Sequence, residues 1–89
     1  MPVMMVCDPS GGGVICEGWA QEVSTPKQLL TYSWTVRVGY ETTVYGTGHE
    51  PYVGFSCYQG QSVRVTMRLS NGSFTGTSTQ HFVCGNETQ

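Results

Sequence analysis

Cysteine and histidine are the residue types in this chain with the widest chemistry, because they form disulfides, bind metals and act as nucleophiles or bases. A zinc site needs cysteines a few residues apart or a cysteine and histidine cluster. The sequence has eight residues between its first two cysteines, no histidine near them, and two further cysteines far along the chain. This spacing favours two disulfides and predicts no metal site. The four cysteines are Cys7, Cys16, Cys57 and Cys84.

Disulfides place the chain in an oxidising compartment, so we expect a secreted, extracellular or periplasmic protein. Its 89 residues are enough for one domain. A domain of this size buries only a little over ~60% of the surface of its unfolded chain, so covalent cross-links are expected to matter. We expect a single domain over residues 1–89, with a core from 3 to 84 and a flexible tail from 85 to 89.

Catalytic constellations are not visible in the sequence. A serine hydrolase triad needs a serine, a base and an acid within hydrogen-bond reach, but the chain has one aspartate, Asp8, and the histidines His49 and His81, without a Gly-x-Ser-x-Gly motif. Glycoside hydrolysis needs two facing carboxylates. Glu17 and Glu22 lie five residues apart and are expected on opposite faces of a strand. We therefore expect no enzyme and no cofactor.

Charged residues are few and mixed, with four Lys and Arg against six Asp and Glu and a net charge of −2. The basic residues are not clustered along the sequence, which predicts that no basic face exists. The electrostatic attraction that drives binding to nucleic acid or anionic lipid is then missing. No apolar stretch is long enough for a membrane span. We therefore expect neither a nucleic-acid partner nor membrane insertion.

Aromatic residues are the candidates for binding. Trp34 alternates with apolar residues and is expected in the core. Trp19 is expected to point outward, opposite Cys16, and could stack against a sugar ring or anchor a protein partner. The competing interpretation is that Trp19 covers a sheet edge or packs under a loop. The candidate binding residues are Trp19, Tyr40, Tyr45, Tyr52 and Tyr58.

The elements that would position these residues are strands, because apolar residues recur with a period of two. The clearest cases are residues 61–70, 31–38 and 14–21, where Gly18 and other small residues are expected to face inward. Further strands are expected at 3–7, 42–45, 53–58 and 76–84. Turn residues separate them, and Asn71-Gly72 is a strong hairpin signal. Seven short strands without helices predict an all-β, antiparallel sandwich.

Two segments resemble the immunoglobulin-like modules called PKD domains. They are Leu30-Thr31-Tyr32-Ser33-Trp34-Thr35-Val36 and the alternating run from Gly60 to Gly72, and the resemblance covers residues 14–84. The chain also resembles cysteine-bearing immunoglobulin-like modules of secreted bacterial proteins. The resemblance implies a seven-stranded immunoglobulin-like β-sandwich.

The resemblance also implies a disulfide pairing. The second and fifth strands are neighbours in such folds, and the first can run parallel beside the last. Cys16–Cys57 and Cys7–Cys84 are then the expected bonds. The alternative is Cys7–Cys16 with Cys57–Cys84, and four cysteines allow one connectivity more.

For function, we expect a non-catalytic module that serves as a spacer, adhesion or protein-interaction unit. One alternative is a carbohydrate-binding accessory module that uses the exposed aromatic residues. Another is a small secreted inhibitor of a hydrolase that presents the segment 40–52. The partner, protein or polysaccharide, is not indicated, and the chain is expected to be a monomer or a dimer paired through edge strands.

Overall fold

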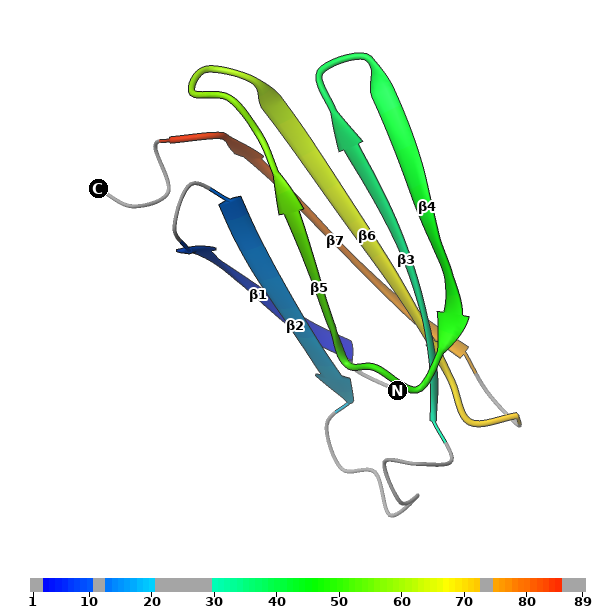
Figure 1. The fold of residues 1–89 in the computed structure, drawn as a ribbon. Coiled ribbons are helices and arrows are strands. Elements are labelled where there is room, and N and C mark those ends of the chain that lie inside the picture. Colours follow the sequence, from blue (N-terminus) through cyan, green and yellow to red (C-terminus); the bar gives the residue numbers. More distant parts are fainter. Residues whose placement is uncertain (1–2, 11–12, 21–29, 73–74, 86–89) are drawn as a thin grey trace.

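The computed structural model describes residues 3–10, 13–20, 30–72 and 75–85, and these residues form seven strands in two antiparallel sheets (Figure 1). One sheet has three strands in the order β1-β2-β5, and the other has four in the order β4-β3-β6-β7. The strands are β1 (Val3–Ser10), β2 (Gly13–Ala20), β3 (Thr31–Val38), β4 (Glu41–Gly48), β5 (Tyr52–Ser56), β6 (Ser62–Ser70) and β7 (Thr75–Val83). The all-β, two-sheet prediction is confirmed.

Strand boundaries differ most from expectation at β4. The sequence indicated residues 42–45, whereas the strand runs from Glu41 to Gly48 because it pairs with β3 from Tyr32 to Val38. A register shift between Ser33 and Trp34 keeps the two strands paired through this region. The segment 40–52 proposed as an inhibitor loop is therefore largely a paired strand with short turns on either side.

The core lies between the two sheets and follows the expected alternation. Trp34 is 3% exposed, which confirms its place in the core, and its ring nitrogen donates a hydrogen bond to the carbonyl oxygen of Glu50 at 3.4 Å. Burial raises the pKa of the Tyr32 phenol, because the ionised form would lose its hydration. The buried residues are Met5, Val14, Cys16, Leu30, Tyr32, Trp34, Val36, Val53, Val63, Val65, Met67, Leu69 and Cys84.

Small residues face inward on β2, as expected, and Gly18 shows why. A Cβ atom at this position would overlap the buried side chain of Met67 from the opposite sheet. The sheets are also joined along their β1 and β7 side, where Gln80 Nε2 donates a hydrogen bond to the Met5 carbonyl oxygen at 2.7 Å. Close packing and one polar contact thus fix the distance between the layers.

The Asn71-Gly72 hairpin is confirmed by the pairing of Ser70 with Thr75 at the start of the β6–β7 ladder. Gly72 has φ of 96°, a conformation that residues with a Cβ rarely adopt. Gly39 has φ of 62° between β3 and β4 and places Tyr40 at the tip of that turn. These two glycines fix the registers that align the outward side chains of the larger sheet.

The expected disulfide pairing is wrong, and the alternative is correct. Cys7 bonds to Cys16, with Cα atoms 4.0 Å apart, and Cys57 bonds to Cys84, with Cα atoms 6.1 Å apart. None of the four cysteines is free. Two disulfides indicate an oxidising, extracellular environment.

Strand pairing explains why the disulfides connect Cys7 with Cys16 and Cys57 with Cys84. β1 forms a hairpin with β2 instead of running parallel beside β7, so Cys7 lies directly opposite Cys16. On its other side β2 does pair with β5, as expected, but the partner of Cys16 there is Val53. Cys57 lies four residues farther along, about 13 Å at roughly 3.3 Å per residue, which is too far for a bond to Cys16.

The second disulfide joins the ends of strands in different sheets. Cys57 follows β5 and Cys84 follows β7, and backbone hydrogen bonds of 2.8 Å tie Cys84 to Gly60 and Gln61. The chain within the described ranges contains no helix long and apolar enough to cross a membrane.

Candidate functional site

The five aromatic residues predicted as a binding platform lie in three separate places. Trp19 and Tyr52 are on the outer face of the three-stranded sheet. Tyr45 is half-buried and packs against the core. Tyr40 and Tyr58 are almost fully exposed, in the β3–β4 turn and the segment between β5 and β6. A single five-ring platform does not form.

Large apolar side chains gather on the outer face of the three-stranded sheet. Each is between 40% and 54% exposed, on the side opposite the core. We call this surface the apolar face. It consists of Met4 and Val6 on β1, Ile15 and Trp19 on β2, and Tyr52 on β5.

Register places these side chains in adjacent rows. Met4 lies directly opposite Trp19 in the first row. In the next row Val6 and Tyr52 flank Glu17, which pairs with both. Cross-strand neighbours on one face have Cβ atoms about 5 Å apart, so Met4 and Trp19 are direct neighbours, whereas the carboxylate of Glu17 lies between Val6 and Tyr52. Trp19 is 40% exposed on this outer face.

The outer face of the four-stranded sheet has the opposite chemistry. Threonine and serine dominate it, together with Arg37, Arg64, Arg68 and His81. Of the four Lys and Arg residues in the sequence, three are on this arginine face. The expectation that no basic face exists is wrong, because strand pairing brings together arginines that are far apart in the sequence.

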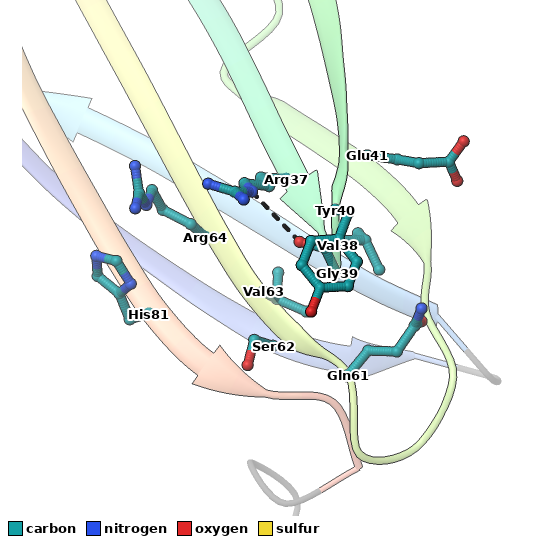
Figure 2. Close-up of a pocket in the computed structure, with 10 residues that line it drawn as sticks. All are labelled: Arg37, Val38, Gly39, Tyr40, Glu41, Gln61, Ser62, Val63, Arg64 and His81. Carbon is teal, nitrogen blue, oxygen red and sulfur yellow. Dashed lines mark hydrogen bonds between the residues drawn. The ribbon is translucent and has the colours of Figure 1, made fainter.

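Two arginines and a histidine share one row of this face. Arg37 on β3 lies directly opposite Arg64 on β6, which lies directly opposite His81 on β7. We call these three residues the arginine row. They line an open hollow of about 690 Å³ at the end of the sheet, together with Tyr40, Gln61 and Ser62. Figure 2 shows the two guanidinium groups and the imidazole along the strands, and the Tyr40 ring at the turn between β3 and β4.

The charges of the arginine row are not compensated within the described part of the chain. Arg37 Nε donates a hydrogen bond to the Gly39 carbonyl oxygen at 3.3 Å, which draws the guanidinium toward the turn. Glu41 is the nearest acidic residue in the hollow, but it projects to the other side of Tyr40 (Figure 2). No carboxylate among the described residues extends from the arginine face. The hollow is therefore suited to an anionic group.

The residues examined for catalysis are dispersed. His49 Nδ1 lies 2.7 Å from the Leu30 carbonyl oxygen and must donate to it, so this histidine joins two chain segments. His81 belongs to the arginine row, and Asp8 is on the other sheet. The described residues contain no group of three His, Cys, Asp or Glu side chains that could hold a metal. Glu22 lies outside the described residues.

The arginine row was missed because charge was examined along the sequence and not across strands. A usable signal was present: Arg37 and Arg64 both occupy polar positions of alternating strands. The Asn71-Gly72 turn also fixes the β6–β7 register, which places Arg64 beside His81.

No family model matches the chain, and no curated protein matches it. The geometry of the two outer faces is therefore the basis for assigning a function.

Proposed function

We propose that this chain is a non-catalytic immunoglobulin-like module of a secreted or cell-surface protein and that it binds a protein partner through the apolar face. The strand order supports the immunoglobulin-like assignment. The first, second and fifth strands form one sheet, and the third strand, which carries the core Trp34, is central in the other. The PKD-like segments 30–36 and 60–72 contribute β3 and β6, the two central strands of the larger sheet.

The observation that carries the proposal is the gathering of Met4, Val6, Ile15, Trp19 and Tyr52 on one solvent-facing sheet surface. Monomeric soluble proteins rarely expose large contiguous apolar patches unless the patch is an interaction site. Aromatic residues and methionine are enriched at protein interfaces, and tryptophan and tyrosine are frequent binding hot spots.

The carboxylates of the apolar face indicate the character of the partner. Glu17 lies in the middle of the patch between Val6 and Tyr52, and Asp8 lies at its edge, opposite Ile15. A complementary surface would present aliphatic or aromatic groups for the patch and a basic side chain for Glu17. An arginine meets this need best, since its planar group pairs with carboxylates and stacks on aromatic rings.

The test is affinity capture from the secreted fraction of the source organism. The wild-type chain, a Trp19→Ser variant and a control Thr79→Ser variant on the arginine face are compared as baits. We expect one protein to be captured by the wild type and the control and lost with Trp19→Ser. Capture that is unchanged by Trp19→Ser would contradict the proposal.

Sugar stacking on Trp19 and Tyr52 is the competing function, since two rings share this face. Titration of neutral polysaccharides while recording tryptophan fluorescence separates the two. A protein interface also needs the aliphatic neighbours, so Ile15→Ser should weaken capture of a protein partner, whereas stacking of a sugar should tolerate it.

A further inference from the structure

The arginine row places like charges where they cost stability. Arg37 and Arg64 are directly opposite each other on neighbouring strands, the arrangement in which like charges repel most. His81 extends the row on β7. Neighbouring strands are about 4.8 Å apart, so the backbones of the three residues span about 10 Å. An anion held between them would relieve this repulsion.

The groups around the row define the ligand more closely. Tyr40 is 96% exposed at the tip of the β3–β4 turn and lines the same hollow as Arg37 and Arg64. Ser62 adds a hydroxyl to the same hollow, whereas the Gln61 amide oxygen accepts a hydrogen bond from the Tyr58 backbone N–H at 2.7 Å. An aromatic ring stacks against the apolar face of a sugar, a hydroxyl group matches sugar hydroxyls, and guanidinium pairs with carboxylate or sulfate.

The position of the row argues against an extended acidic peptide. Peptides commonly bind by adding a strand to an exposed sheet edge. Arg37 and Arg64 lie on β3 and β6, the two central strands, whose backbone groups are already paired on both sides. A ligand on Arg37 and Arg64 is therefore held by their side chains and not by strand addition to β3 or β6.

Nucleic acid fits less well than a saccharide. Three arginines on a face of a chain with net charge −2 provide few phosphate contacts, and affinity for nucleic acid scales with their number. Among the residues that line the hollow, Tyr40 is the one tyrosine, phenylalanine or tryptophan, whereas single-stranded nucleic acid binding proteins stack successive bases on several rings.

We propose that the arginine row is a binding site for an acidic saccharide, with a sugar ring on Tyr40 and its carboxylate or sulfate group on Arg37 and Arg64. The site is on the opposite sheet from the apolar face and does not depend on the protein partner proposed above.

The direct test is calorimetric titration at low salt with oligogalacturonate, which carries carboxylates, and with chondroitin sulfate, which also carries sulfates. A neutral dextran serves as the uncharged comparison. We expect binding of at least one acidic probe, no binding of dextran, and weaker binding as NaCl is added. The stronger of the two acidic probes identifies the preferred anionic group.

Variants locate the site. Arg37→Gln with Arg64→Gln should lower the affinity for the acidic probe at least tenfold. Tyr40→Ala should also lower the affinity, because the sugar ring loses its stacking partner. This variant should still fold, because an exposed side chain can be removed with little loss of stability. The affinity of Arg64→Lys for the acidic probe should lie between those of the wild type and Arg64→Gln, because lysine keeps the charge but not the planar pair of donors.

Arg68→Gln is the matched control. Arg68 is on the same face and the same strand as Arg64, about 13 Å along it, and is not part of the row. Its replacement should change affinity less than threefold. The proposal is overturned if neither acidic saccharide binds, if Arg68→Gln weakens binding as much as Arg64→Gln, or if a DNA oligonucleotide binds as tightly as the saccharide. Thermal denaturation of each variant confirms that the compared chains are folded.

Discussion

The two sheets present similar apolar surfaces to the core and opposite surfaces to solvent. On β2 the inward residues are small and apolar, and the outward ones are Ile15, Glu17 and Trp19. On β6 the inward residues are valine, methionine and leucine, and the outward ones are serine, threonine and arginine. Folding needs only the inward set, so the outward sets are free to differ. The proposed protein partner and the proposed saccharide are each assigned to one of these outer faces.

Each face also departs from what stability alone would favour. The apolar face leaves large side chains in water, which loses the free energy that burial would provide. The arginine face places like charges opposite each other. These two departures are different in kind, one hydrophobic and one electrostatic, and the two proposed ligands differ in chemistry accordingly.

Replacing the two tryptophans should give the largest difference in stability between a residue of the core and a residue of an outer face. Trp34→Ala should destabilise the fold by about 3–5 kcal/mol, because it leaves a cavity between the sheets. Trp19→Ala should cost about 1 kcal/mol or less, since Trp19 is 40% exposed. Urea denaturation of both variants measures the difference. Equal losses would mean that Trp19 is part of the core and would remove the basis of the apolar face.

One disulfide, Cys7–Cys16, joins two strands of the same sheet, and the other, Cys57–Cys84, joins strands of different sheets. In the chain-entropy model, loss of Cys57–Cys84, which spans 27 residues, costs about 3.5 kcal/mol, and loss of Cys7–Cys16, which spans 9, costs about 2.5 kcal/mol. The paired Cys→Ala variants can be compared by thermal denaturation. If removal of Cys7–Cys16 is the more damaging, the β1–β2 hairpin depends on its cross-link more than loop length suggests.

Gly18 tests how closely the two sheets must approach. Gly18→Ala forces its new methyl group against Met67 and should cost about 1–3 kcal/mol. Gly48→Ala is a useful control, because a Cβ there meets nothing within 4 Å. Met67→Leu or Met67→Val in the Gly18→Ala background should restore part of the loss if the overlap with Met67 is the cause.

The smallest expected effect is an increase in the free energy of unfolding. Arg64→Gln removes one of two opposed charges and should stabilise the fold by about 0.2–1 kcal/mol at low salt. Added salt screens the repulsion and should reduce this gain. Arg68→Gln should give no comparable gain, since Arg68 lies opposite Ser33 and Thr77. A destabilised Arg64→Gln variant would show that the row is held together by interactions other than charge.

The fold was largely predictable because the signals were local. Alternation on β3 and β6 identified the strands and their buried faces, and Asn71-Gly72 identified a hairpin. The disulfide pairing was not predictable in this way, because it depends on whether β1 pairs with β2 or with β7, and the residues of β1 are compatible with both.

The candidate sites required distances across the sheets. Trp19 could be assigned to an outward face from its alternation with Cys16, but Met4 and Tyr52 join it only through the β1–β2 and β2–β5 registers. Likewise, Arg37 and Arg64 become neighbours only once β3 and β6 are paired. Local sequence patterns identify each strand but do not show which distant strands pair or in what register.

The cross-links also determine how the chain would respond to mechanical tension. Force applied between the two ends passes through the sulfur atoms of Cys7–Cys16 and Cys57–Cys84, so the loops 8–15 and 58–83 carry no load. Only the segments outside these loops can lengthen, by at most about 3.5 Å per residue. β6 and β7 lie in the unloaded loop, whereas β3 lies in the loaded segment. Stretching would therefore pull Arg37 away from Arg64 and His81 and could release a ligand held between them.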